Sequence, residues 1–187
     1  MLNSVVALFN AGAAAAAGDY ESIATVTVGS GGSANLEFTS IAADWTHLQL
    51  RAIGRTTASA NSNYVKLQFN SDTGSNYAYH ALYGDGTSAL AAAATSQTQT
   101  YLQRFTGNNA AASIFGTFIV DILDYDKTNK YKTIRQLGGF DRNGAGVIYL
   151  TSGLWMSNNA ITSIKLTPES GNFAQYSHFA LYGIKGA

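Results

Sequence analysis

The chain has 187 residues, a formal net charge of zero and charged side chains at only 12% of its positions. It has no cysteine, which excludes disulfides, thiol nucleophiles and thiolate metal sites. Nucleic-acid binding usually leaves an excess of Lys and Arg, and none is present. The length fits one domain with a short appendage, and the low charge favours a subunit of an assembly over a free enzyme.

The first segment, MLNSVVALFNAGAAAAAGDYES, differs from the rest of the chain. A secretory signal needs a basic start, but the first charged residue is Asp19. A membrane span needs about 20 apolar residues, and Leu2 to Ala17 is shorter and only weakly apolar. Residues 1–19 are therefore predicted to be an extended or partly helical arm that buries its apolar tip against a partner. The tip consists of Val5, Val6, Leu8 and Phe9.

From Tyr20 onward the apolar residues alternate with a period of two, which is typical of β-strands. The runs ESIATVTVG, THLQLRAIG and YVKLQFN show it clearly, and Gly, Asn, Asp and Ser clusters separate the runs. About ten strands without a convincing helix predict an all-β fold. We expect residues 20–187 to form a single antiparallel β-sandwich resembling a jelly roll.

Three stretches give more specific expectations. SIFGTFIVDILDY (residues 113–125) is apolar on both faces, which predicts a central strand buried on both sides. Asn143–Gly144 separates two apolar runs and predicts a β-hairpin. TSALAAAATSQTQT (residues 87–100) has mixed Ala, Thr and Ser content, and we expect a mobile or interface loop there, with a short helical turn as the alternative.

No catalytic or cofactor motif is found. His47, His80 and His178 stand alone, without a spacing that places two ring nitrogens on one metal. There is no G-x-S-x-G nucleophile motif and no glycine-rich phosphate loop followed by Lys and Ser or Thr. A pair of carboxylates facing one cleft stays open as an alternative, since it has no sequence signature. We expect a protein that is not an enzyme and uses no cofactor.

The acidic run DILDYDKTNKYK resembles the start of a calcium loop. Asp124, Asp126 and Thr128 occupy the first three ligand positions. The sixth position is Asn129 where glycine is needed, and the twelfth is Arg135 where a bidentate Glu is needed. We therefore expect a turn and no metal site.

The stretch NYAYHALYGDG concentrates aromatic side chains beside a polar loop. Tyr77, Tyr79 and Tyr83, together with His80, are the candidate contact residues. Tyrosine is a common anchor of protein interfaces and can stack on sugar rings, and it also fills sandwich cores. Core packing, a subunit interface and a glycan contact are the three alternatives.

The body resembles a group of virion proteins from tailed bacteriophages, many with marine and cyanobacterial hosts. YESIATVTVGSGG at the start of the body and FALYGIKG at its end are the motifs that carry the resemblance, which runs from about Tyr20 to the C-terminus. Members of this group are small structural proteins or terminal modules of longer tail proteins. The resemblance assigns no catalytic residue.

The resemblance implies a structural protein on the outer surface of a phage particle. We expect a decoration or cement protein of the head, anchored by the arm to other virion proteins such as the major capsid or a tail protein. The alternative is a tail-fibre or tail-tip module that binds a host glycan. A homo-oligomer is expected, with a trimer favoured, and neither nucleic acid nor a membrane is an expected partner.

Overall fold

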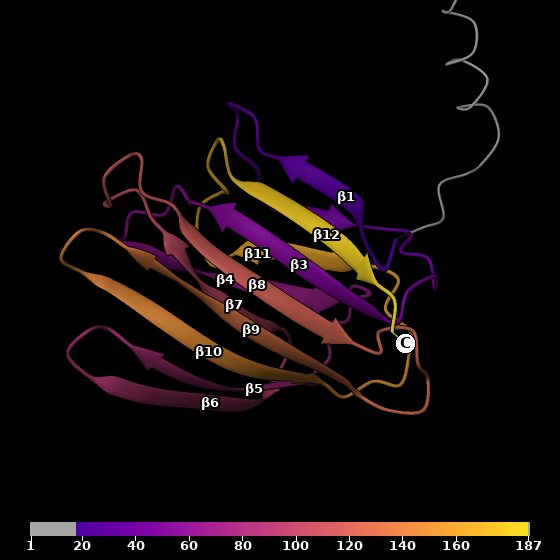
Figure 1. Ribbon diagram of the computed structural model, residues 1–187. Helices are drawn as coiled ribbons and strands as arrows, with labels where there is room; N and C mark the ends of the chain where they lie inside the picture. The colour runs from indigo at the N-terminus through magenta and orange to yellow at the C-terminus, as the bar shows by residue number, and fades with distance from the viewer. Residues whose placement is uncertain (1–17, 187) are drawn as a thin grey trace, which may run out of the picture.

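The computed structural model describes residues 18–186, which form twelve strands in two antiparallel sheets and contain no helix (Figure 1). In spatial order the large sheet contains β1 (Tyr20–Thr27), β12 (His178–Ile184), β3 (His47–Gly54), β8 (Gly116–Leu123), β9 (Lys132–Asp141), β10 (Gly146–Trp155), β5 (Tyr77–Gly84) and β6 (Ala89–Gln97). The small sheet contains β2 (Leu36–Phe38), β11 (Ile164–Pro168), β4 (Ser62–Phe69) and β7 (Thr100–Thr106).

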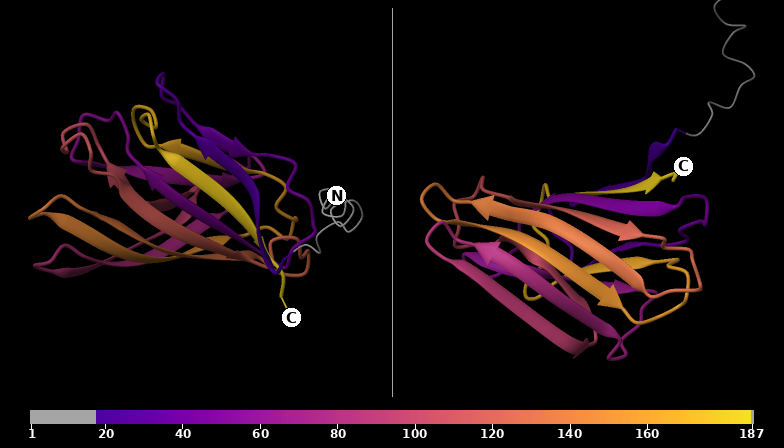
Figure 2. Two further views of the ribbon diagram at one scale, coloured as in Figure 1. Left: turned by 45° about the horizontal axis from the view of Figure 1, so that its top comes forward. Right: turned by 60° about the horizontal axis from the view of Figure 1, so that its bottom comes forward.

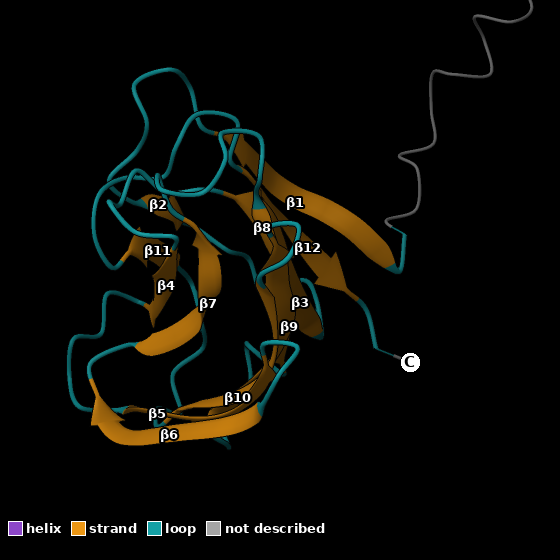
Figure 3. Cartoon of the chain, turned by 90° about the vertical axis from the view of Figure 1, so that its left-hand side faces the viewer, coloured by secondary structure: helices purple, strands orange, loops and turns teal. Residues whose placement is uncertain are grey.

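The two sheets pack face to face, so the predicted all-β sandwich is confirmed. Figure 3 shows the layers on edge: the large sheet curves, and its β10, β5 and β6 end turns beneath the small sheet. Figure 2 shows the twist of the large sheet from two further directions. The small sheet has half as many strands and covers the middle of one face of the large sheet, so the edge strands β1 and β6 stay largely exposed. The other face of the large sheet points outward.

An aromatic cluster joins the sheets near the middle of the sandwich. Phe105 of β7 is fully buried, and its ring stacks on Phe118 of β8 with the centroids 4.9 Å apart. Phe173 and Phe179 contact the same ring at centroid distances of 6.3 and 5.9 Å. A Cβ added to Gly54 would lie 2.2 Å from the Phe105 ring, so this glycine makes room for the phenyl group.

A second aromatic group lies where β10 ends and β5 begins. Tyr77 is fully buried beside Trp155, with 6.3 Å between their ring centroids. Its hydroxyl oxygen accepts a hydrogen bond from the backbone N–H of Phe69 at 3.0 Å. Burial raises the pKa of Tyr77 to about 12, so the phenol stays neutral and acts as a structural hydrogen-bonding group.

The Asp72 carboxylate connects the elements around Trp155 by hydrogen bonds, and we expect its removal to destabilise the fold. Its carboxylate accepts hydrogen bonds from Trp155 Nε1 at 2.7 Å, from Asn76 Nδ2 at 2.9 Å and from the Gly74 N–H at 2.8 Å. Burial alone would raise the pKa of the Asp72 carboxyl group. The hydrogen bonds together lower it by more, so the pKa of Asp72 lies below its ordinary value. The carboxylate therefore stabilises the fold above the ordinary carboxyl pKa of about 3.9, and the gain is lost as pH falls through its lower folded pKa.

Asp72→Ala should lower the free energy of unfolding at pH 7 by about 1.5–3 kcal/mol, the usual worth of hydrogen bonds to a charged group. Urea denaturation at pH 7 and at the lowest pH where the wild type stays folded measures the difference. The difference in free energy of unfolding between wild type and variant should be smaller at the acidic pH. Glu169→Ala, at an exposed site, is the control. An equal difference in free energy of unfolding at both pH values would contradict a stabilising role of the ionised Asp72 carboxylate.

The structure corrects the expected loop over residues 87–100. Residues Ala89–Gln97 form β6, which pairs with β5 at the edge of the large sheet. Ala91 lies opposite Leu82 in this ladder, and Ala93 lies opposite His80. Alanine has weak strand propensity, so the backbone pairing with β5 decides the conformation.

The expectation for residues 113–125 is right in position and wrong in burial. The strand β8 lies between β3 and β9 in the interior of the large sheet. Only one of its faces is buried, however, because Ile119 and Leu123 point outward and are exposed. The apolar residues on this outward face therefore need another explanation.

The predicted hairpin at Asn143–Gly144 is confirmed. It connects β9 and β10, which pair along their whole length. Asn143 has a φ of 58° and Gly144 a φ of 111°, the left-handed backbone that tight hairpin turns require.

Candidate functional site

The outward face of the large sheet carries a row of exposed aliphatic side chains. Ile119, Leu137, Leu150 and Leu82 are direct cross-strand partners on β8, β9, β10 and β5. Their exposed fractions are 36, 52, 52 and 57%. Ala91 continues the row onto β6. We call Ile119, Leu137, Leu150 and Leu82 the outer apolar row.

This row departs from the usual chemistry of a water-facing sheet. An antiparallel sheet with one solvated face normally alternates apolar residues inward with polar residues outward. Here β10 places Tyr149 and Thr151 inward, and Leu150 and Ile148 outward. Contiguous apolar patches of this kind are uncommon on monomers and usually mark an interaction surface.

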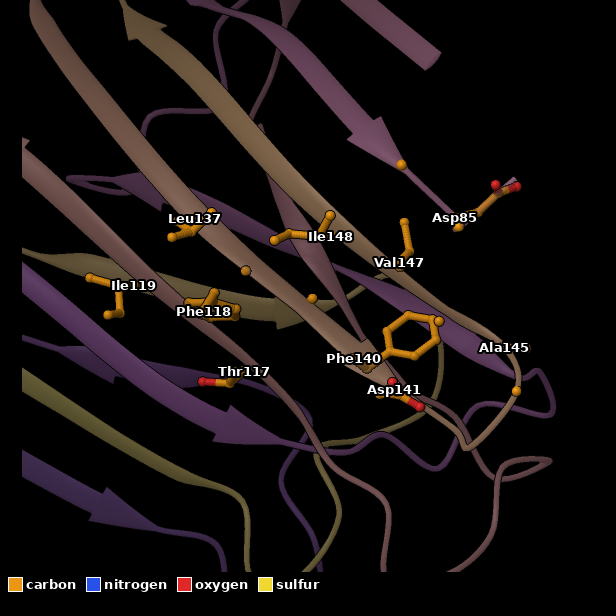
Figure 4. Close-up of a pocket in the computed structure, with 16 residues that line it drawn as sticks. Asp85, Thr117, Phe118, Ile119, Leu137, Phe140, Asp141, Ala145, Val147 and Ile148 are labelled. Atoms are coloured by element: carbon orange, nitrogen blue, oxygen red, sulfur yellow. The ribbon is translucent and has the colours of Figure 1, made fainter. Parts of the chain in front are cut away.

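A shallow groove of about 750 Å³ runs beside the outer apolar row (Figure 4). Ile148 lies between Gly84 and Gly139 on the neighbouring strands, so its side chain has no side-chain neighbour directly across either strand pair. A Cβ on Gly139 would lie 2.1 Å from the carbonyl oxygen of Val147, so this glycine is required by the backbone. The groove is a consequence of the fold and offers space for an apolar side chain of a partner.

Polar residues border the row on its other side. Asp121 of β8 lies opposite Arg135 of β9, and Ser152 and His80 continue this line across β10 and β5. Gln49 Nε2 donates a hydrogen bond to Asp121 Oδ1 at 2.7 Å. The face therefore combines an apolar centre with a polar border of both charges, the usual anatomy of a protein interface.

The four predicted contact residues do not form one surface. Strand alternation turns His80 outward, where it is exposed, and turns the three tyrosines toward the small sheet. Tyr77 lies in the core and has no exposed surface, so for this residue the core alternative holds and the expected contact is corrected. Tyr79 and Tyr83 are half-buried and face the space between the sheets.

The remaining sequence candidates are the arm and the calcium-like run. The arm residues Val5, Val6, Leu8 and Phe9 lie outside the described residues. Within residues 18–186 no group of three or more His, Cys, Asp or Glu side chains could hold a metal ion. Asp124 of the calcium-like run forms an ion pair with Lys130 at 2.7 Å, and its backbone N–H donates a hydrogen bond to His47 Nδ1 at 3.0 Å.

The outer apolar row was missed by sequence reasoning. Leu137 and Leu150 each stand in strands whose alternation is visible, but alternation does not say which face is covered. The signal that could have found the row is the two-sided apolar character of residues 113–125, which was interpreted as double burial.

Comparison with known proteins finds neither a matching family model nor a matching curated protein. In the part of the chain that the structure describes, no helix is long and apolar enough to span a membrane.

Proposed function

We propose that this protein is a non-enzymatic structural protein of a tailed-phage particle, and that copies associate through the outward face of the large sheet. The outer apolar row is the observation that carries the proposal, because four aliphatic side chains in register across four strands need a partner surface. The resemblance of the body to tailed-phage virion proteins supports the biological setting.

The size of the face supports a second copy of the chain as the occupant. Eight strands about 4.8 Å apart, each about eight residues long, give a face of about 34 Å by 27 Å. The flattened outline of this face is about 900 Å². A stable interface needs about 800 Å² from each partner, so it would take up most of the face.

The charges on the face also favour self-association. Arg51 and Arg135 are cationic, and Asp121 lies between their strands on β8. Positive and negative charges therefore lie close together on the face, so two copies can associate without strong net repulsion. A closed arrangement about a rotation axis, with a trimer favoured, would cover the row in every copy.

The position proposed on the particle is the outer surface of the head, as a decoration or cement protein. Residues 1–19 supply the attachment through Val5, Val6, Leu8 and Phe9 to another virion protein such as the major capsid protein. Gold-labelled antibody against the chain should mark heads of purified particles. Label at the tail tip would favour the receptor-binding alternative, and the absence of label from particles would reject the virion assignment.

Deleting residues 1–17 should separate attachment from folding. The truncated chain should keep the circular dichroism and oligomeric state of the full chain, since β1 begins at Tyr20. Its incorporation into particles, measured by quantitative mass spectrometry, should fall at least about tenfold, because burial of the apolar tip contributes about 25 cal/mol per Å². Changing Val5, Val6, Leu8 and Phe9 to serine should have the same effect. Incorporation at the full-chain level would contradict the role of the arm.

A further inference from the structure

A cleft of about 470 Å³ opens between the two sheets, away from the outer apolar row. Ser62 of β4 and Arg104 of β7 line it from the small sheet, and Tyr83 of β5 and Tyr149 of β10 line it from the large sheet. The β9–β10 hairpin closes one side with Arg142. The volume suits a ligand of the size of one sugar residue.

Arg104 lines this cleft with a guanidinium group that has no carboxylate partner among the described residues. Its guanidinium lies 4.1 Å from the Tyr64 ring centroid, and Nη2 donates a hydrogen bond to Tyr64 Oη at 2.7 Å. Nη1 contacts Ser62 Oγ at 3.5 Å, while Nε is buried and has no hydrogen-bond partner. Among the ion pairs of residues 18–186, none includes Arg104. Since Nη2 is bonded to Tyr64 and Nε is enclosed, Nη1 is the donor that Arg104 can offer to a ligand in the cleft.

Arg142 brings a second cation from a different element. It lies in the hairpin turn, where its backbone N–H donates to the Ala145 carbonyl at 2.8 Å. Its Nε is also buried without a hydrogen-bond partner, and no carboxylate in the described chain pairs with it. Two guanidinium groups that have no carboxylate partner among the described residues therefore line one cleft, and guanidinium groups bind carboxylates with good geometry.

The rest of the lining is aromatic and hydroxyl-bearing. Tyr83 and Tyr149 stack with ring centroids 5.1 Å apart. Ser62 and Thr87 contribute hydroxyl groups, and Asp85 is the one acidic residue in the lining. The Asp85 carboxylate accepts hydrogen bonds from the Thr87 and Ser88 N–H groups at 2.9 and 2.8 Å. Aromatic faces suit the C–H surface of a sugar, and hydroxyl and carboxylate groups suit its hydroxyls.

We propose that this cleft binds a sugar that carries a carboxylate group. The carboxylate would be held by Arg104 and Arg142, the ring would lie against the tyrosine pair, and Ser62 and Asp85 would bind hydroxyls. A bare anion would use the two arginines but leave the aromatic wall unused, and a neutral sugar would leave both guanidinium groups without an acceptor. This inference does not depend on self-association, because no residue of the outer apolar row lines the cleft.

Calorimetric titration of the full chain with D-glucuronate, D-glucose, acetate and inorganic phosphate tests the site. Saturable binding of glucuronate is expected, with glucose, acetate and phosphate each at least about tenfold weaker. Arg142→Gln should weaken glucuronate binding at least about fivefold, and Arg104→Gln with Arg142→Gln at least about fiftyfold. Lys165→Gln, on β11 of the small sheet and outside the cleft lining, is the control for loss of a cation and should bind like the wild type.

Arg142 is half-buried in a turn, so its single variant should fold even if loss of Arg104 disturbs the sandwich. Circular dichroism and the unfolding midpoint verify this. No saturable glucuronate binding, or equal binding by folded Arg142→Gln, would overturn the site. Glucose binding as tightly as glucuronate would remove the role of the arginines, and phosphate or acetate binding as tightly would reduce the cleft to an anion site; either result rejects the proposal.

Discussion

Phe105→Ala should lower the free energy of unfolding by about 3–5 kcal/mol, the range for truncating a buried phenylalanine. The ring is fully buried and contacts Phe118, Phe173 and Phe179. It also fills the space left by Gly54, so removal leaves a cavity where β7 meets the large sheet. Little collapse is possible there, because the surrounding rings are held by strands on both sides.

Urea denaturation monitored by circular dichroism and by Trp fluorescence measures this effect. Tyr176→Ala is the control, since Tyr176 is 69% exposed and its loss should change the free energy of unfolding by less than about 0.5 kcal/mol. Phe105→Leu should give an intermediate loss because it leaves a smaller cavity. A change below about 1 kcal/mol for Phe105→Ala would contradict the central position of this ring in the core.

Leu137→Lys combined with Leu150→Lys should abolish self-association without unfolding the chain. Both side chains point outward, so lysine can extend into water in the separated copies. In the assembly two cations per copy would enter an apolar interface, where burial of each leucine contributes about 1.5–3 kcal/mol. The dissociation constant should therefore rise at least about 100-fold.

Sedimentation velocity over a range of concentrations measures the association. Tyr131→Lys is the matched control: Tyr131 is 52% exposed, the same fraction as Leu137 and Leu150, but lies in the β8–β9 connection. It should associate like the wild type. A monomeric wild type at high concentration, or a double variant that associates normally, would reject the outward face as the self-association surface.

Much of the fold could be predicted because period-two alternation is a local property of the sequence. The strands around Leu50 and Leu67 follow directly from it, since both side chains alternate with polar neighbours and both are fully buried. The turn at Asn143–Gly144 follows from the left-handed backbone that these two residues tolerate. Such signals need no knowledge of distant parts of the chain.

The pairing of distant strands could not be predicted in the same way. Ala91 and Ala93 have little strand preference of their own, and they are extended because their backbone pairs with β5. Likewise, Ile119 and Val120 look equally suited to a core, and only the placement of the small sheet decides that Val120 is buried and Ile119 exposed. The cleft was hidden for the same reason, because Arg104 and Arg142 come together only when both sheets are in place.

The order of strands in the large sheet sets when the molecule can finish folding. The strand β12 lies between β3 and β1, and among the described strands it is the sole neighbour of β1. Thr27 and His178 are hydrogen-bonded although 151 residues separate them. A contact of such sequence separation forms late and slowly. During synthesis β1 therefore waits without a partner until residues 178–184 have left the ribosome, and the sheet is then completed by insertion of its last strand.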